Sequence, residues 1–152
     1  MRALLSTVGT RGEVQPVVAV ATRLIASGHE AVVCAPPDFR VWAESLGIPF
    51  VPVGPELRGT AEQGERVLPS PEQRRQMIDS TVTAQFAAVA AGADGCDVIV
   101  GGGALAIAAH SVAEHRGIGY VYASFCPITL PSAHHAPPVY GIPGEKQPDG
   151  TV

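Results

Sequence analysis

Short runs of apolar residues alternate along this chain with stretches of helical periodicity, and this alternation most constrains the fold. The apolar runs lack the polar alternation of a half-exposed strand, which predicts a sheet covered on both faces, and the prolines of residues 49–53 favour an outer position for the strand there. Strands of this kind, separated by helices, form a parallel sheet with helices on both sides. We therefore predict an α/β fold, a doubly wound, Rossmann-like parallel sheet with strands at residues 3–7, 31–35, 49–53, 97–100 and 120–123.

Helices are predicted between these strands. The first helix ends near Gly28, a typical C-terminal stop, and presents one apolar face made of Val14, Val17, Val18, Ala21, Leu24 and Ile25. A short helix is expected at 39–46, and an alanine-rich one at 104–116 that ends at Gly117. The longest helix opens with the capping box of residues 70–73 and runs to about residue 91. It is expected to pack through Ile78, Val82, Phe86 and Val89.

Length and composition limit the classes of function. A chain of 152 residues has the length of one domain, and its 46% hydrophobic content excludes disorder for most of it. The net charge of −4, without a basic run, and the 5% aromatic content argue against nucleic-acid binding. Charged residues make up 16%, below the roughly 25% usual in soluble proteins. We therefore expect one face to be covered by something else.

The cysteines and the apolar runs indicate the compartment. Cys34, Cys96 and Cys126 are too few and too widely spaced for a disulfide framework, which favours a reducing environment. No apolar run approaches the roughly 18 residues of a membrane span, so no membrane span is expected. The apolar run at the N-terminus is too short for a signal peptide. We expect a cytoplasmic protein.

Two segments lack any periodic apolar face. Residues 54–70 are polar and aperiodic, and so long a loop inside a compact domain is usually functional or mobile. Residues 126–152 are rich in proline. We therefore predict a domain over residues 1–140 and a linker or disordered tail over 141–152. A doubly wound half that stops in a linker suggests a second domain or a partner.

The carboxyl ends of parallel strands meet at one edge of a sheet, where ligands of such folds bind. Segments 8–13, 101–103 and 124–135 should therefore lie together. Glu13, at the start of the first helix, has two interpretations: it satisfies the helix N-terminus, or it points into a cleft and accepts a proton from a hydroxyl. Arg11 beside it binds a phosphate, orients Glu13, or forms a weak surface ion pair.

Glycines and histidines at the same edge leave further alternatives. Gly9 and Gly12 match neither a P-loop nor a dinucleotide fingerprint. Residues 101–106 match GxGxxA at the start of a predicted helix, but the next strand ends without an acid for a ribose hydroxyl, so we favour glycines that allow close approach. His134 and His135 either line a cleft or are solvated, and with no third ligand nearby no metal site is predicted.

Several runs of sequence together carry a family resemblance. The run LLSTVGTRGEVQP at residues 4–16 resembles the opening of the GT-B-fold glycosyltransferases that decorate glycopeptide and other actinobacterial antibiotics. The resemblance covers residues 1–140 and is to the N-terminal, acceptor-binding half of that fold. Further matches follow in order at residues 26–30, 34–38, 46–54, 111–114 and 126–127.

The resemblance implies a function. In that family the N-terminal domain binds the acceptor, a second Rossmann-like domain binds a nucleoside-diphosphate sugar, and the cleft between them is the active site. The chain would supply the acceptor site and the general base for inverting sugar transfer to a hydroxyl of a natural-product aglycone. The C-terminal donor-binding domain is absent from these residues, so this half alone would be inactive. The resemblance implies no cofactor besides the sugar donor, and no metal.

The resemblance also assigns residues. The family's base is an Asp or His three residues before the proline of the first loop, and Glu13 holds that position before Pro16. Glu13 is therefore the predicted catalytic residue, and segments 54–70 and 125–140 correspond to those that shape the acceptor pocket. The predicted substrate-binding residues are Thr10, Arg11, Gly12, Gly102, Phe125 and His134.

Two other functions compete with this interpretation. The chain could be a non-catalytic, stand-alone acceptor-binding or auxiliary domain, because a lone half cannot bind the donor sugar well. Alternatively, the glycines of residues 101–106 could belong to a nucleotide-binding domain of the flavodoxin or dinucleotide type. Binding of a nicotinamide or flavin cofactor would distinguish the second of these.

Overall fold

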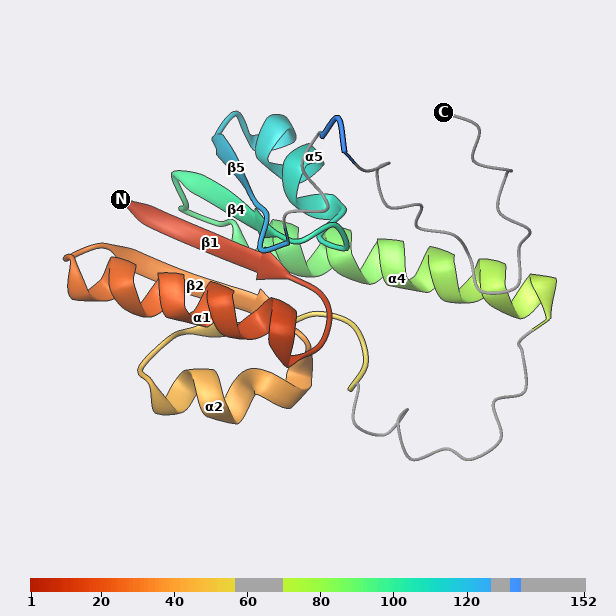
Figure 1. Ribbon diagram of the computed structural model, residues 1–152, viewed down its shortest axis with the longest axis horizontal. Coiled ribbons are helices and arrows are strands. Elements are labelled where there is room, and N and C mark those ends of the chain that lie inside the picture. Colours follow the sequence, from red (N-terminus) through yellow and green to blue (C-terminus); the bar gives the residue numbers. More distant parts are fainter. Residues whose placement is uncertain (57–69, 127–131, 135–152) are drawn as a thin grey trace.

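The predicted strands form one sheet in which every pairing is parallel (Figure 1). The computed structural model describes residues 1–56, 70–126 and 132–134, and within them the sheet has five strands in the order β3-β2-β1-β4-β5. The strands are β1 (Arg2–Thr7), β2 (Glu30–Ala35), β3 (Phe50–Pro52), β4 (Val98–Gly102) and β5 (Gly119–Ala123). This arrangement confirms the predicted doubly wound α/β fold.

The order of the strands places a switch point beside β1. The chain moves outward from β1 to β2 and β3, then returns to pair β4 with the other side of β1. In register, Leu4 of β1 lies opposite Val32 on one side and Ile99 on the other. Loops leaving β1 and β4 therefore diverge at the carboxyl edge, which opens a crevice there.

Helices cover both faces of the sheet. The helices α1 (Arg11–Ala26) and α2 (Arg40–Ser45) lie on one face, while α4 (Pro71–Gly92) and α5 (Ala108–Arg116) lie on the other (Figure 1). Successive residues of a strand point to opposite faces, so Leu5 packs in the core beneath α1 and Leu4 in the core beneath α4 and α5. Both side chains are fully buried, and each contributes roughly 1.5–3 kcal/mol of hydrophobic stabilisation.

The predicted packing face of the longest helix is only partly correct. Val89 is buried and Val82 is half-buried, but Ile78 and Phe86 are exposed, and the buried residues of α4 begin at Gln85. A helix of 22 residues is roughly 33 Å long, about twice the length of the five-residue strand β4. The first half of α4 therefore extends past the end of the sheet (Figure 1), and it contributes no residue to the cores formed by the described part of the chain.

The start of the last helix also differs from the prediction. Residues 103–107 form a turn, and α5 begins only at Ala108. Gly103 takes a positive φ of 79°, which breaks the path from β4 into a helix. The GxGxxA run thus does not open a helix directly, as a dinucleotide site requires. The predicted end of this helix is confirmed, because Gly117 closes it in the left-handed conformation.

Parts of several predictions lie outside the described residues. These are most of the loop 54–70, most of the proline-rich segment 126–152 with His135, and the whole predicted tail 141–152. Within the described ranges, none of the helices combines the length and the hydropathy needed to cross a membrane.

Candidate active site

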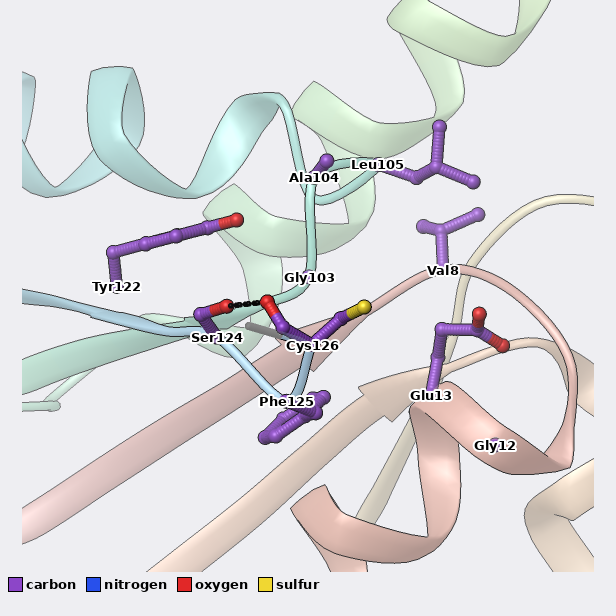
Figure 2. Close-up of a pocket in the computed structure, with 10 residues that line it drawn as sticks. All are labelled: Val8, Gly12, Glu13, Gly103, Ala104, Leu105, Tyr122, Ser124, Phe125 and Cys126. Carbon is purple, nitrogen blue, oxygen red and sulfur yellow. Dashed lines mark hydrogen bonds between the residues drawn. The ribbon is translucent and has the colours of Figure 1, made fainter. Parts of the chain in front are cut away.

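A cavity of about 310 Å³ opens at the carboxyl ends of β1, β4 and β5 (Figure 2). It lies at the switch point of the sheet and has the size of a small ligand pocket. Residues of segments 8–13, 101–103 and 124–126 meet around it, as the sequence predicts, whereas the described residues 132–134 do not line it. The lining residues are Val8, Gly12, Glu13, Gly103, Ala104, Leu105, Tyr122, Ser124, Phe125 and Cys126.

Glu13 lies in the first turn of α1 and both caps the helix and lines the cavity. The backbone N–H and the hydroxyl of Thr10, the residue that precedes the helix, each donate a hydrogen bond of 2.8 Å to Glu13 Oε2. Within the described part of the chain, Glu13 Oε1 accepts no hydrogen bond. The positive end of the helix dipole stabilises a carboxylate at this place. The half-buried Glu13 side chain therefore satisfies the helix N-terminus and also lines the cavity, while its acceptance of a proton stays a prediction.

The turn before α1 is shaped around this carboxylate. Gly9 has a φ of 142°, and a Cβ atom at that position would lie 2.9 Å from Glu13 Oε2. Any other residue would therefore both strain the backbone and push the carboxylate away. Gly9 is thus part of the site, although it does not line the cavity itself.

The floor of the cavity is fixed by packing at the end of β4. The buried Thr7 hydroxyl donates to the carbonyl of Gly102 at 2.9 Å. A Cβ atom on Gly102 would lie 2.7 Å from Val17 Cγ2 and 3.2 Å from Phe125 Cζ. Gly102 thus makes room for two side chains and does not itself line the cavity, whereas the ring of Phe125 does.

The other predicted binding residues lie around the site rather than in it, apart from Gly12, which lines the cavity. The guanidinium of Arg11 lies 5.2 Å from the centre of the Trp42 ring, and its Nε donates to Gln15 Oε1 at 3.2 Å. Arg11 forms no ion pair with Glu13 in the described residues. The backbone N–H of His134 donates to the Ser132 hydroxyl, and His134 does not contribute to the cavity wall.

The segments predicted to meet at this edge do not include three of the lining residues, Ala104, Leu105 and Tyr122. Leu105 and Tyr122 are 51% and 45% exposed, although both are large and hydrophobic. The Cys126 thiol is directed toward the side of the cavity where Val8 and Glu13 lie (Figure 2). The positions of these lining residues near strand ends could have predicted their place in the site, because residues that follow parallel strands surround the ligand site.

The cavity carries one carboxylate and no cationic side chain among its lining residues. Such a lining favours an uncharged, partly apolar ligand that offers a hydroxyl or another hydrogen-bond donor to Glu13. Within the described ranges, no group of three or more His, Cys, Asp or Glu side chains could hold a metal ion.

The chain is an α/β domain with a cavity at the switch point of its sheet, the place where such folds bind ligands, and a carboxylate at a helix N-terminus lines that cavity. The chain belongs to the family of glycosyltransferase family 28 N-terminal domains, whose model matches residues 3–134. It is 48% identical over 140 residues to the glycosyltransferase GtfC of Amycolatopsis orientalis, covering 91% of this chain and 34% of that protein. The vancomycin aglycone glucosyltransferase of the same organism is 39% identical over 148 residues, covering 96% of this chain and 36% of that protein.

Solved structures agree with this family and confirm the expected resemblance to antibiotic glycosyltransferases of the GT-B fold. The calicheamicin glycosyltransferase CalG4 superposes with a TM-score of 0.65 at 19% identity, over 89% of this chain and 34% of that one, and so shows the fold. The glycosyltransferase VinC, solved with dTDP, gives a TM-score of 0.60 at 25% identity, over 82% of this chain and 35% of that one. The chain spans about a third of the length of these two Amycolatopsis relatives.

Proposed function

We propose that this chain provides the acceptor site and the general base of a glycosyltransferase that modifies an antibiotic aglycone. The position of Glu13 carries the proposal, because its carboxylate lines the switch-point cavity and is held there by Thr10. The relatives support this class of reaction, since they include a vancomycin aglycone glucosyltransferase and a dTDP-epi-vancosaminyltransferase. The co-substrate is a nucleoside-diphosphate sugar, bound mainly by a second domain.

In the proposed reaction an acceptor hydroxyl lies in the cavity, hydrogen-bonded to Glu13 Oε1. The hydroxyl oxygen attacks the anomeric carbon of the sugar while its proton passes to the carboxylate. The bond between that carbon and the phosphate oxygen breaks, and its electron pair leaves with the nucleoside diphosphate. Attack and departure occur on opposite faces of the sugar, so the configuration inverts. The residues of this chain need no metal or further cofactor for their part.

The hydrogen bonds from Thr10 have a clear role in this scheme. They hold Oε2 and fix the plane of the carboxylate, so that Oε1 is the oxygen available to the acceptor. A carboxylate positioned before the reaction loses little freedom in the transition state, which is how a fixed base accelerates proton transfer.

The size of the cavity indicates how the aglycone is bound. A volume of about 310 Å³ accommodates a ring-sized group but not an entire glycopeptide. The group that carries the reacting hydroxyl would enter the cavity and pack on Phe125. The rest of the aglycone would lie across the exposed side chains of Leu105 and Tyr122.

A transfer assay tests the proposal. The chain is assayed alone and also fused to the part of GtfC that follows its matched region, with vancomycin aglycone and other aglycones as acceptors and dTDP- and UDP-sugars as donors. Mass spectrometry detects the glycosylated product. We expect product from the fusion and none from the chain alone, because the donor site belongs to the second domain.

The Glu13→Gln variant of the fusion tests the base. We expect turnover to fall by roughly 10²–10⁴-fold with little change in acceptor binding, the usual effect of losing a general base. Glu114→Gln, which alters an exposed carboxylate on α5, is the matched control and should leave turnover unchanged. An unaltered rate in Glu13→Gln would remove Glu13 from this role. Aglycone binding without transfer in the fusion would favour a stand-alone binding domain.

A further inference from the structure

Gln85 is a buried polar side chain that the proposed chemistry does not use. It lies in the middle of α4 and is only 4% exposed. Apart from Gln85, the buried polar side chains of the described residues are Ser6 and Thr7 in the central strand β1. An amide in this position is unfavourable unless it is hydrogen-bonded. Its partner therefore indicates what the residue does.

The partner is the backbone of the loop that forms one wall of the cavity. Gln85 Oε1 accepts a hydrogen bond of 3.1 Å from the N–H of Ile107. Ile107 precedes α5, and no side chain of the loop itself caps that helix. The oxygen from α4 thus does for this turn what a capping side chain does for other helices.

The loop has few other hydrogen bonds to hold it. Gly103 N–H donates to the Ala123 carbonyl at 3.1 Å, but the bond from Ala106 N–H to the Gly103 carbonyl is 3.4 Å long. Residues 103–105 line the cavity, and a Cβ atom on Gly103 would lie 4.0 Å from Glu13 Cγ. The distance between this wall and the carboxylate therefore depends on how firmly the loop is attached to α4.

We propose that Gln85 is a positioning residue that holds loop 103–107 in place as the wall of the cavity opposite Glu13. It acts through the Ile107 N–H and does not touch the ligand. The expected effect of Gln85 on acceptor binding rests on the proposed function. Its effect on the position of loop 103–107 does not depend on that function. Replacing it should loosen the wall and weaken acceptor binding without removing the base.

Amide hydrogen exchange on the complete chain tests the effect on the loop. In Gln85→Met, which keeps the length and helix propensity of the side chain, we expect exchange at the hydrogen-bonded amides of Ala106 and Ile107 to rise about tenfold while the amides of β1 stay protected. Gln76→Met, at an exposed position of the same helix, is the matched control and should exchange like the wild type. Unchanged protection in Gln85→Met, or an equal rise throughout β1, would overturn the proposal.

A second variant removes the same hydrogen bond from the loop side. Ile107 has a φ of −69°, which proline adopts, and its side chain is 48% exposed, so Ile107→Pro deletes the donor at a position where the ring fits the backbone. We expect the same increase in exchange at the Ala106 amide. This variant decides the question if Gln85→Met does not fold, and normal protection at Ala106 would contradict the proposal.

Binding of vancomycin aglycone, measured by calorimetry, separates this inference from the proposed function. We expect Gln85→Met to bind roughly three- to tenfold more weakly than the wild type, and Gln76→Met to bind equally well. No binding by the wild type would count against the proposed function, while the exchange data would still test Gln85. Equal affinities in the wild type and Gln85→Met would refute the positioning role.

Discussion

At the scale of single residues, Glu13 caps a helix, and the proposed function would give the same side chain a chemical task. A residue three positions into a helix normally serves the helix by accepting a bond from the capping residue. Here the first turn of α1 lies at the switch point, so the same carboxylate also borders the cavity. The two tasks are compatible because a carboxylate has two oxygens, and Thr10 occupies only Oε2. The identity of Glu13 is thus constrained by the helix and by the site together.

Gly9→Ala should damage the site more than its cost in stability explains. The new Cβ would lie 2.9 Å from Glu13 Oε2, at a φ of 142° that other residues rarely adopt. We expect a loss of about 1–3 kcal/mol in the free energy of unfolding, and a fall in transfer activity of the fusion because the carboxylate is displaced. Chemical denaturation and the transfer assay measure the two effects.

Gly28→Ala provides the control for Gly9→Ala. Gly28 also has a positive φ, of 83°, but a Cβ atom there meets nothing within 4 Å. It should lose comparable stability and keep its activity. If both variants lost activity in proportion to stability, the contact between Gly9 and Glu13 would have no functional meaning.

At the scale of secondary structure, the two halves of α4 are stabilised by different interactions. Its second half packs on the sheet through Val89 and Gly92 and places Gln85 against loop 103–107. Its first half contains no buried residue and depends on local interactions. Ser70 Oγ accepts a bond from the Gln73 N–H at 3.2 Å, and the Gln73 side chain accepts one from the Ser70 N–H at 2.8 Å.

Ser70→Ala should therefore loosen the start of α4 without unfolding the domain. Loss of the cap weakens a helix by about 1 kcal/mol, and that cost falls on turns that are not coupled to the core. We expect faster proteolysis near residues 71–78 with almost no change in the melting temperature. Ser80→Ala, whose hydroxyl bonds a carbonyl within the helix, is the control. A clear drop in melting temperature without faster cleavage would contradict this view of α4.

At the scale of the whole molecule, the sheet has separate cores on its two faces, joined through the strands. The central strand β1 contributes buried side chains to both cores, so the two layers should unfold together. The reactivity of the cysteines tests whether the layers unfold together, because Cys34 is buried beside the central strand whereas Cys126 is exposed at the cavity.

Thiol labelling with iodoacetamide should distinguish these cysteines. Burial raises the pKa of the Cys34 thiol to about 12, so near neutral pH it stays protonated and unreactive in the folded state. We expect Cys126 to react in the native protein and Cys34 to react only as fast as the whole domain unfolds. Peptide mass spectrometry over a denaturant series measures both rates. Native-state labelling of Cys34 would show that the layers open separately.

Much of the fold could be predicted because its signals are local. Apolar runs without alternation marked each strand, and Gly28, Gly117 and Ser70 marked helix ends through conformations and bonds that involve only neighbouring residues. The carboxyl-edge rule then located the cavity, and the position of Glu13 at a helix start explained its capping bonds. Its service as a base stays a prediction.

The remaining features could not be predicted because they depend on where separate elements meet. Ile78 and Phe86 are exposed because the sheet ends before α4 does. The spacing of apolar residues along a helix contains no information about the length of the sheet it packs on. The stacking of Arg11 on Trp42 and the bond from Ile107 to Gln85 join residues 31 and 22 positions apart. The sequence by itself thus determined which segments become strands and helices, since short-range sterics and burial govern that choice. Only the tertiary structure decided which side chains surround the cavity, since long-range packing brings them together.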